Sequence, residues 1–460
     1  MGGSDRIVII ECQRRANEPP ASTRTTDVRA QFGLAPPKDA SDGGGRWVLE
    51  PLSVRLGAGR IIAFTGPSGS GKSTALGLIE AQCPGGHNVG RISFPADCSI
   101  VDGVGAHGSL SEALGLLSAC ALGEAPLWLR RFEEMSEGER FRARLARALG
   151  LHAWAASPAP LLCDEFCGGL HRRAARAVAY NLRKLVTRRK LCVVVATGND
   201  DLLPDLQPDT TVCLLGNGRY VKIDHEPRPR PIRIQRRLRI TPGAKSDYAG
   251  FAAMHYRATD ELGFVDKVFV LREGTGGDAL GIVVYAHGPI ELSLRNRATG
   301  GRFRGRPDLL NREVRIVRRL VIHPDVRGCG LGRMLVRRTL PRAGTRYVEC
   351  LAAMGQVNPV FERAGMKRVG ACPMPRVQAR AMEALEKLGV DPLARDVGVQ
   401  VCRRPQVRSV VAEVVRRWYR ATTGGGEDRV ARQSPPWLAQ TFRGLIGSRP
   451  VYYLWERRAS

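Results

Sequence analysis

Residues 60–76 have the sequence RIIAFTGPSGSGKSTAL, and this stretch decides the fold of the first half of the chain. Its apolar start, Ile61–Phe64, predicts a short buried strand, and the residues after the glycines predict a helix. The turn between them matches the pattern G-x-x-x-x-G-K-[ST], whose glycines let backbone N–H groups curl around an anion at the positive end of a helix. An ordinary Gly/Ser turn is the alternative, but the flanking strand and helix favour a phosphate-binding loop. The residues that we expect to contact a nucleoside triphosphate are Gly66, Pro67, Ser68, Gly69, Ser70, Gly71, Lys72, Ser73 and Thr74.

Two carboxylates follow a second apolar segment. Pro160–Phe166 predicts a strand that ends in Asp164 and Glu165. Transfer of a γ-phosphoryl group needs positioning and charge neutralisation, and an acidic pair at the end of a strand beside the loop supplies both. A solvated strand end is the alternative. We predict that Lys72 reaches the β- and γ-phosphates and that the Ser73 hydroxyl ligates Mg²⁺.

The composition is strongly basic. The 460 residues include 71 Lys and Arg against 44 Asp and Glu, a formal net charge of +27. The length suggests roughly three domains. The charge favours polyanionic partners, DNA or RNA first and an anionic membrane surface second. An arginine-rich genome is the alternative, although arginines also cluster in residues 228–239, 295–306 and 312–319.

Cysteine usage and hydropathy bear on the compartment. The 12 cysteines form no pair of C-x-x-C elements, and Cys163 and Cys167 flank the acidic pair instead of forming a zinc site. The N-terminus lacks the apolar core of a signal peptide, and the sequence has no apolar run of about 18 residues. We therefore expect a soluble, cytoplasmic protein with reduced cysteines and no membrane span.

Four elements follow one another in a defined order. They are the phosphate loop, a helix start with Ser136 and Gly138, the strand end with Asp164 and Glu165, and a further strand. This order resembles the ABC-type ATPase superfamily. The resemblance implies that Asp164 holds Mg²⁺ through water and that Glu165 polarises the attacking water. It also implies that Ser136 and Gly138 close over the γ-phosphate bound to a second subunit, in a homodimer joined through ATP.

Several features depart from that superfamily. The signature is Met135-Ser136-Glu137-Gly138-Glu139 rather than LSGGQ, Gly198-Asn199 stand where a histidine is usual, and Asp102 is the nearest match to the usual glutamine. The segment between Lys72 and Ser136 is also shorter than in transporter members. We therefore expect a member that is not a transporter subunit.

Local patterns add detail elsewhere. Gly90–Phe94 and Ser99–Val104 predict strands, Thr211–Leu215 and Arg219–Ile223 predict a hairpin around Asn-Gly, and Arg295–Arg306 predicts a loop rich in glycine and arginine.

A second glycine-rich turn lies in the other half of the chain. Arg327–Gly332 follows the predicted strand Val314–Ile322, opens the predicted helix Arg333–Leu340 and fits [RQ]-x-x-G-x-[GA]. With Asn358 and Phe361–Met366 downstream, it resembles the GNAT acetyltransferase superfamily, whose loop binds the coenzyme A pyrophosphate. A basic glycine turn that caps a helix is the alternative. The resemblance implies that acetyl-CoA contacts Val321, Ile322, Arg327, Gly328, Cys329, Gly330, Leu331, Gly332, Arg333 and Asn358.

The acid and the base for acyl transfer have several candidates. The superfamily often carries a tyrosine, which protonates the leaving thiolate, where this chain has Phe361. Another acid, or none, must then serve, and amine acylation also needs a proton acceptor. The candidate acids are Tyr256, Tyr285 and Tyr347, and the candidate bases are Glu313, His323 and Glu349.

Over most of its length the chain resembles soluble ABC-type ATPases fused to a predicted acetyltransferase domain. The shared patterns include His255-Tyr256-Arg257, Val348–Gly355 and Pro450–Trp455. We predict an α/β fold, a P-loop ABC-type nucleotide-binding domain followed by a mixed α+β GNAT-like domain. The predicted parts are an N-terminal strand and polar segment (1–45), the ATPase domain (46–225), a basic Pro/Arg linker (226–245) and the GNAT-like domain (246–460), with a helical insertion at 375–445.

The predicted function is that of an ATP-hydrolysing, acetyl-CoA-dependent N-acyltransferase that acts on nucleic acid or on a nucleic-acid-bound target. The expected cofactors are ATP, Mg²⁺ and acetyl-CoA. One alternative is a nucleic-acid maintenance ATPase whose GNAT-like half only binds, which Phe361 favours. The other is an ABC transporter ATP-binding subunit, which the short segment before Ser136 and the extra domain disfavour.

Overall fold

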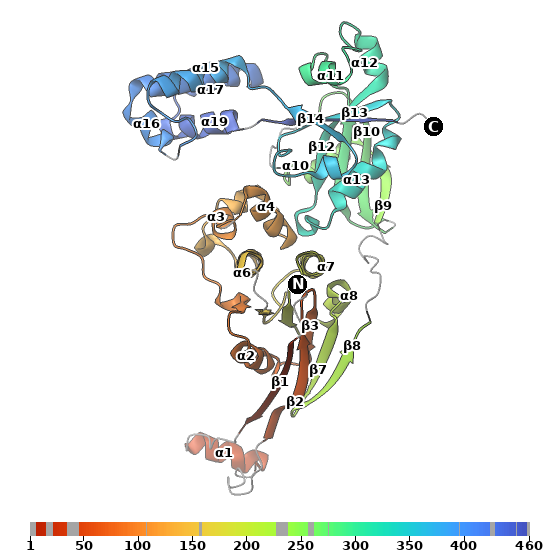
Figure 1. The fold of residues 1–460 in the computed structure, drawn as a ribbon, viewed down its shortest axis with the longest axis vertical. Helices are drawn as coiled ribbons and strands as arrows, with labels where there is room; N and C mark the ends of the chain where they lie inside the picture. Colours follow the sequence, from red (N-terminus) through yellow and green to blue (C-terminus); the bar gives the residue numbers. More distant parts are fainter. Residues whose placement is uncertain are drawn as a thin grey trace. The chain divides into compact units, whose positions relative to one another are not determined.

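The structure is a computed structural model of the chain (Figure 1). It describes residues 6–14, 22–34, 46–106, 108–155, 159–226, 238–255, 262–274, 276–394, 396–423, 428–447 and 449–457. The chain divides into two compact units. The first comprises Met1–Asp260, Phe269–Ile282 and Leu320–Leu335, and the second comprises Glu261–Val268, Val283–Arg319 and Val336–Ser460. The first unit therefore holds both glycine-rich turns.

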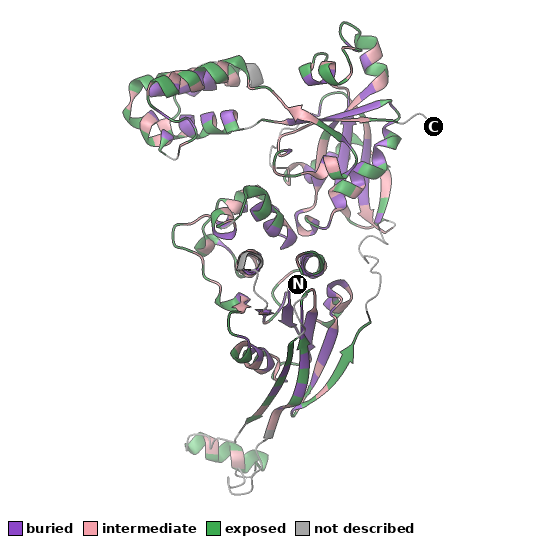
Figure 2. Cartoon of the chain, viewed as in Figure 1, coloured by how far each residue is buried: buried purple, intermediate pink, exposed green. Residues whose placement is uncertain are grey.

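A six-stranded sheet forms the centre of the first unit. Its strands, in spatial order, are β4 (His87–Asn88), β5 (Leu161–Cys163), β6 (Val193–Ala196), β3 (Ile61–Thr65), β7 (Thr210–Gly216) and β8 (Arg219–Asp224). The first five are parallel, and β8 returns antiparallel to β7 as the predicted hairpin. Every residue of β3, β5 and β6 is buried, as Figure 2 shows in purple, because parallel strands are covered on both faces.

Helices follow or surround these strands. They are α1 (Thr23–Phe32), α2 (Lys72–Gln82), α3 (Ile100–Val104), α4 (Leu110–Ala119), α5 (Ala125–Trp128), α6 (Glu137–Ala155), α7 (Arg172–Arg189), α8 (Leu203–Leu206) and α10 (Ala249–Ala252).

Two segments predicted as strands do not form strands. Gly90–Phe94 begins within the 3-10 helix η2 (Val89–Arg91), and Ser99–Val104 forms α3 with its cap. Ser99 accepts a hydrogen bond from the Asp102 backbone N–H at 3.2 Å, which caps the helix. A short apolar run fits either element, and the serine cap decides it here.

An antiparallel pair packs against the six-stranded sheet's core. β1 (Arg6–Arg14) pairs with β2 (Arg46–Leu56) as a separate two-stranded sheet. Val8 and Ile10 of β1 join a hydrophobic cluster with Phe64 and Ile79. By contrast, α1 has no buried residue.

A seven-stranded sheet dominates the rest of the chain. Its spatial order is β14 (Lys367–Ala371), β15 (Val451–Glu456), β13 (Tyr347–Ala352), β12 (Val314–Ile322), β11 (Ala279–Ala286), β10 (Val265–Glu273) and β9 (Leu238–Gly243). β12 and β13 are parallel, whereas β15 lies antiparallel between β13 and β14. β9 falls within the segment predicted as a linker.

Helices of this half fall into two groups. Those near the sheet are α11 (Ser293–Ala298), α12 (Pro307–Glu313), α13 (Leu331–Thr339) and α14 (Val360–Arg363). α11 occupies part of the segment predicted as an arginine-rich loop.

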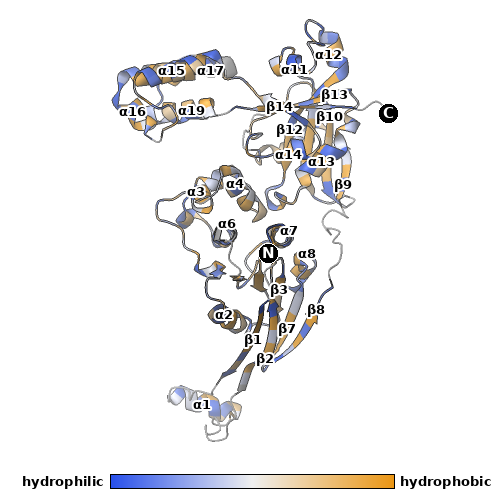
Figure 3. Ribbon diagram, in the orientation of Figure 1, coloured by the Kyte–Doolittle hydropathy of each residue, from blue (hydrophilic) through white to orange (hydrophobic). Residues whose placement is uncertain are grey.

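The second group lies between β14 and β15 in the sequence and forms its own bundle. Its helices are α15 (Arg376–Lys387), α16 (Val397–Arg403), α17 (Pro405–Thr423), α18 (Asp428–Ala431) and α19 (Pro435–Gly447). Their core includes Leu385, Val401, Val411 and Phe442, while hydrophilic residues cover much of α15 and α17 (Figure 3). The predicted helical insertion is therefore a small bundle with its own core.

Candidate functional site

The phosphate-binding loop leaves the central strand of the first sheet. β3 ends at Thr65, and the next six residues turn back into α2. Gly66, Gly69 and Gly71 have φ values of +125°, +77° and +101°, which L side chains rarely adopt. A Cβ on Gly66 would also overlap the carbonyl oxygen of Leu214. The glycines of the motif are therefore required by the backbone itself.

Lys72 and the start of α2 supply positive charge to this loop. The Lys72 ammonium donates to the carbonyl oxygens of Gly66 and Pro67, both at 2.7 Å. The helix begins after Gly71 without a side-chain cap, so its first N–H groups face the loop. Ser70 is 5% exposed, and its hydroxyl has no hydrogen-bond partner among the described residues. The predicted residues thus form an anion site at a helix N-terminus.

The acidic pair lies at the same edge of the sheet. Ala63 of β3 and Cys163 of β5 both pair with Val195 of β6, so Asp164 and the start of the phosphate loop follow at nearly the same level. One carboxylate oxygen of Asp164 accepts from the Glu165 N–H at 2.9 Å. This brings the predicted catalytic residues together at the carboxyl edge of parallel strands.

The backbone after the acidic pair is strained. Glu165 and Cys167 have φ values of +47° and +59°, in the left-handed region that non-glycine residues avoid. Each such residue costs on the order of 1–3 kcal/mol and is kept only where its surroundings fix it. The strain therefore falls on Glu165, the residue that the resemblance predicts to polarise the attacking water.

Mg²⁺ suits the oxygen donors at this edge. The Ser73 hydroxyl is exposed in the first turn of α2, and Asp164 is half-buried. No group of three or more His, Cys, Asp or Glu in the described part of the chain could hold a metal ion. Mg²⁺ is commonly bound by one or two protein oxygens together with substrate phosphates, which is what Ser73 and Asp164 offer.

The predicted signature residues lie at the N-terminus of α6. Ser136 donates its backbone N–H and its hydroxyl to the carboxylate of Glu139, at 2.9 and 3.0 Å. A carboxylate three residues into the helix thus satisfies the backbone N–H of the residue before it, which is one half of a capping box. Gly138 stands in the first turn, so Ser136 and Gly138 belong to an exposed helix start.

Together the loop, the acidic pair and the parallel sheet define a P-loop nucleoside triphosphatase. No protein-family model matches the chain. The lipoprotein-releasing system ATP-binding protein LolD 1 of Rhodospirillum rubrum is 32% identical over 198 residues, covering 34% of this chain and 84% of that protein. The aliphatic sulfonates import ATP-binding protein SsuB 2 of Nocardia farcinica is 29% identical over 228 residues, covering 46% and 86%. The chain belongs to the ABC-type ATPases, and ATP binding and hydrolysis are the activities of this part.

Solved structures also resemble a portion of the chain. The dimeric structure of a bacterial ABC transporter cassette is 19% identical and covers 40% of this chain and 94% of its own, with a TM-score of 0.32.

The second glycine-rich turn has a different environment. The Arg327 guanidinium donates to three backbone carbonyls, those of Ile322 at 2.8 Å, Met254 at 2.7 Å and Gly123. Asn181 of α7 donates to the Arg327 carbonyl at 3.4 Å. Arg327 therefore joins separate segments of the first unit.

The turn divides into a packed half and an open half. A Cβ on Gly328 would lie 2.7 Å from the Ser118 carbonyl oxygen, and burial raises the pKa of the Cys329 thiol to about 12. Gly330, by contrast, has nothing within 4 Å of the position of a Cβ, and Arg333 is exposed. Val321 and Leu331 are buried. The start of α13 therefore carries an exposed basic residue close to a glycine with free space around it.

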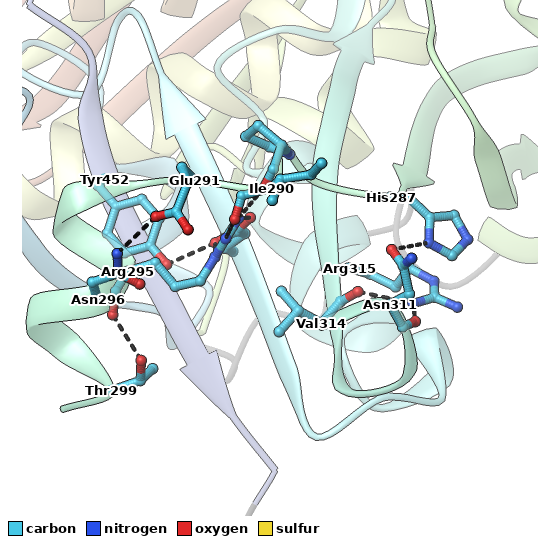
Figure 4. Close-up of polar contacts among 12 residues, drawn as sticks. His287, Ile290, Glu291, Arg295, Asn296, Thr299, Asn311, Val314, Arg315 and Tyr452 are labelled. Carbon is cyan, nitrogen blue, oxygen red and sulfur yellow. Dashed lines mark hydrogen bonds and ion pairs between the residues drawn. The ribbon is translucent and has the colours of Figure 1, made fainter. Parts of the chain in front are cut away.

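Glu349, a predicted base, lies in a buried ion pair. Both Glu349 and Arg295 are 0% exposed, and the guanidinium donates to the two carboxylate oxygens at 2.9 and 2.8 Å. Arg295 also donates to the carbonyls of Ile290 and Pro289. The Tyr452 hydroxyl donates to Glu349 at 2.8 Å, and Figure 4 shows Arg295 and Tyr452 side by side. Sequence reasoning placed Arg295 in a basic loop and missed this cluster.

The other predicted acids and bases that the structure describes have shifted pKa values. Burial raises the pKa of Tyr285, which shares a hydrogen bond with Thr339, and burial raises that of Tyr347. Hydrogen bonds from Arg302 lower the pKa of Glu313. Burial lowers the pKa of His323, against the attraction of Asp325.

Asn358 and Phe361 of the predicted downstream motif each make contacts of their own. The Asn358 N–H bonds to the Met354 carbonyl at 2.8 Å, and Phe361 is buried 5.6 Å from the Tyr453 ring. Tyr256 lies outside the described residues.

Proposed function

We propose that this chain is an ATP-hydrolysing cassette that pairs with a second copy through ATP and acts on nucleic acid or a nucleic-acid-bound target. The observation that carries the proposal is the register of β3 and β5 against β6, by which the phosphate loop and Asp164-Glu165 leave the sheet at one edge. Positioned charge beside a γ-phosphate is what phosphoryl transfer requires.

Each residue of that edge has a proposed task. Lys72 exchanges its bonds to Gly66 and Pro67 for oxygens of the β- and γ-phosphates. Ser73 and Asp164 hold Mg²⁺, which neutralises phosphate charge. Glu165 orients the attacking water and accepts its proton. Ser136 and Gly138 of a second copy cover the γ-phosphate, since their helix start is exposed.

Substitution of the proposed base tests both the chemistry and the pairing. Glu165→Gln keeps the shape of the side chain but removes the proton acceptor. We expect ATP binding within about threefold of wild type, loss of phosphate release by on the order of 100-fold, and a dimer by light scattering when Mg-ATP is present. A monomer under those conditions contradicts pairing through ATP.

Exposed arginines support a nucleic-acid partner. Arg297, Arg304, Arg306 and Arg312 are exposed on α11, α12 and the turn between them. Phosphate contacts of this kind make binding fall steeply with salt. The test is the affinity for a DNA or RNA oligonucleotide at 50 and 200 mM salt, with Arg304→Ala/Arg306→Ala as the variant. If neither salt nor the variant changes the affinity, the basic composition reflects an arginine-rich genome and not a nucleic-acid partner.

A second candidate function is acetyl-CoA-dependent N-acyl transfer by the GNAT-like part. The open half of the second turn favours it, because Gly330 and Arg333 leave room and charge for a pyrophosphate at the start of α13. His323 is then the preferred base, since its lowered pKa keeps the imidazole neutral at pH 7. Transfer of label from acetyl-CoA to nucleic acid, polyamine or peptide acceptors tests this function.

The buried state of Glu349 favours the reading in which this part only binds. A buried carboxylate that already accepts from Arg295 and Tyr452 is a poor proton acceptor for an incoming amine. Acetyl-CoA then stabilises the protein without being consumed, and an acylated product excludes this reading.

The relatives compared above are named as transporter ATP-binding proteins. None of the described helices is long and apolar enough to cross a membrane. We propose a role outside transport because the matched segments leave more than half of this chain uncovered. Co-purification with a membrane permease contradicts that proposal.

A further inference from the structure

Thr197 links the three strand ends that form the nucleotide edge. It follows β6 directly and is 1% exposed. Its backbone N–H donates to the Phe64 carbonyl of β3 at 3.0 Å. Its hydroxyl donates to the Phe166 carbonyl at 3.1 Å, just after the acidic pair of β5. One buried residue therefore contacts the segments that carry both the phosphate loop and Glu165.

Both backbone polar groups of Phe166 are hydrogen-bonded to the end of β6 and to the residue after it. Its N–H donates to the Ala196 carbonyl at 2.7 Å, and its carbonyl accepts from the Thr197 hydroxyl. Phe166 stands between Glu165 and Cys167, the two non-glycine residues with left-handed φ. Such conformations persist only where neighbouring bonds fix them, and the Thr197 hydroxyl supplies one of these bonds.

The same hydroxyl also orders the turn after β6. It accepts from the Asn199 N–H at 3.1 Å, so one oxygen bonds both to the catalytic segment and to the Asn199 turn. Asn199 is half-buried, and Gly198-Asn199 together stand where the superfamily usually has a histidine after the threonine. Because β6 lies between β3 and β5, this turn faces the position of a γ-phosphate.

We propose that Thr197 is a positioning residue for ATP hydrolysis, whose hydroxyl fixes the backbone that aims Glu165 and sets Asn199 beside the γ-phosphate. The proposal rests on the proposed role of Glu165. The methyl group is not needed for this task, whereas the hydroxyl is. Thr197→Val keeps the shape and removes the hydroxyl, and Thr197→Ser keeps the hydroxyl.

The full-length protein is assayed for Mg-ATP turnover and ATP affinity. We expect Thr197→Val to lower kcat by on the order of 100-fold, the cost of misplacing a catalytic group, with the ATP Kd within about threefold of wild type. Thr197→Ser restores kcat to within about threefold of wild type. Thr210→Val is the matched control, because Thr210 is also 1% exposed in this sheet and donates its hydroxyl to Asp224 at 2.7 Å. It should lose thermal stability but keep kcat.

A double-mutant cycle separates positioning from general damage. In a Glu165→Gln background, Thr197→Val should lower the residual turnover by less than about threefold, because the group it positions is gone. A full additive loss there, or a serine variant as slow as valine, overturns the proposal. If Thr197→Val does not fold, Thr197→Ala replaces it in every comparison. Wild-type protein without turnover overturns the role of Glu165 as well, whereas normal turnover in Thr197→Val overturns only the role of Thr197.

Discussion

The two glycine-rich turns of the first unit use their basic residues in different ways. Lys72 bonds to two carbonyls of its own loop, Gly66 and Pro67. Arg327 bonds to carbonyls of three separate segments, at Gly123, Met254 and Ile322. The lysine can therefore exchange its partners for phosphate oxygens without moving another element. The arginine cannot do so without releasing the segments that it joins.

This difference shows what makes a glycine motif an anion site. Both turns follow a strand and open a helix, and both contain glycines with positive φ. What distinguishes them is whether the cation's bonds are local and replaceable. In the second turn the exposed cation is Arg333, which follows Gly330 and lies at the end of the turn away from Arg327.

The largest effect should come from the first turn. Lys72→Ala removes the ammonium that neutralises the β- and γ-phosphates, and we expect ATP hydrolysis to fall by on the order of 1,000-fold. Thermal stabilisation by Mg-ATP should fall with it, while stabilisation by acetyl-CoA stays unchanged. Arg333→Ala, an exposed basic residue of the second turn, is the control and should leave hydrolysis within about twofold of wild type. Equal losses in the two variants would remove the distinction between the turns.

The next effect concerns Glu349 in β13, the strand that follows the second turn and α13. Glu349→Gln leaves Arg295 as a buried charge without its counter-ion, and we expect a loss of about 3–5 kcal/mol in the free energy of unfolding. Glu313→Gln, whose partner Arg302 is exposed, should cost less than about 1 kcal/mol. Urea denaturation followed by tryptophan fluorescence measures both. A cost for Glu349→Gln no larger than that for Glu313→Gln contradicts the buried pair.

The sequence predicted the phosphate loop and the acidic pair better than the contacts of Arg295 and Arg327. The phosphate loop and the acidic pair are contiguous motifs next to apolar strands, so local spacing suffices, and the relatives confirm the ABC-type ATPase. The GNAT-like assignment stays a prediction. The buried pair was missed because Arg295 and Glu349 are 54 residues apart, and nothing local marks that arginine as a core residue. The bonds of Arg327 to distant carbonyls were hidden for the same reason.

A finer comparison lies within the second turn. Gly328→Ala places a methyl group 2.7 Å from the Ser118 carbonyl oxygen at a φ of +82°, and we expect a loss of about 3–4 kcal/mol in the free energy of unfolding. Gly330→Ala has the same φ but open space, so it should cost only about 1–2 kcal/mol. Thermal denaturation of both variants measures the difference. Equal costs would mean that the packed half of the turn is not tightly docked.

The smallest effect is a pH dependence of the free energy of unfolding, which we expect from His152 in the first compact unit. Burial lowers the pKa of His152 in α6 to about 4, with the charge of His87 as a second cause, and the side chain is 1% exposed. The unfolded chain therefore binds the proton more tightly between about pH 6.5 and 4. The stabilisation from neutral His152 is complete above pH 6.5 and is lost as the pH falls through this window, by roughly 2 kcal/mol at pH 5. His152→Gln should flatten the melting temperature over that window, while His323→Gln, at a half-buried position beside the second turn, should flatten it less. Wild-type melting that does not change between pH 7 and pH 5 would mean that His152 is solvated or paired in the folded protein.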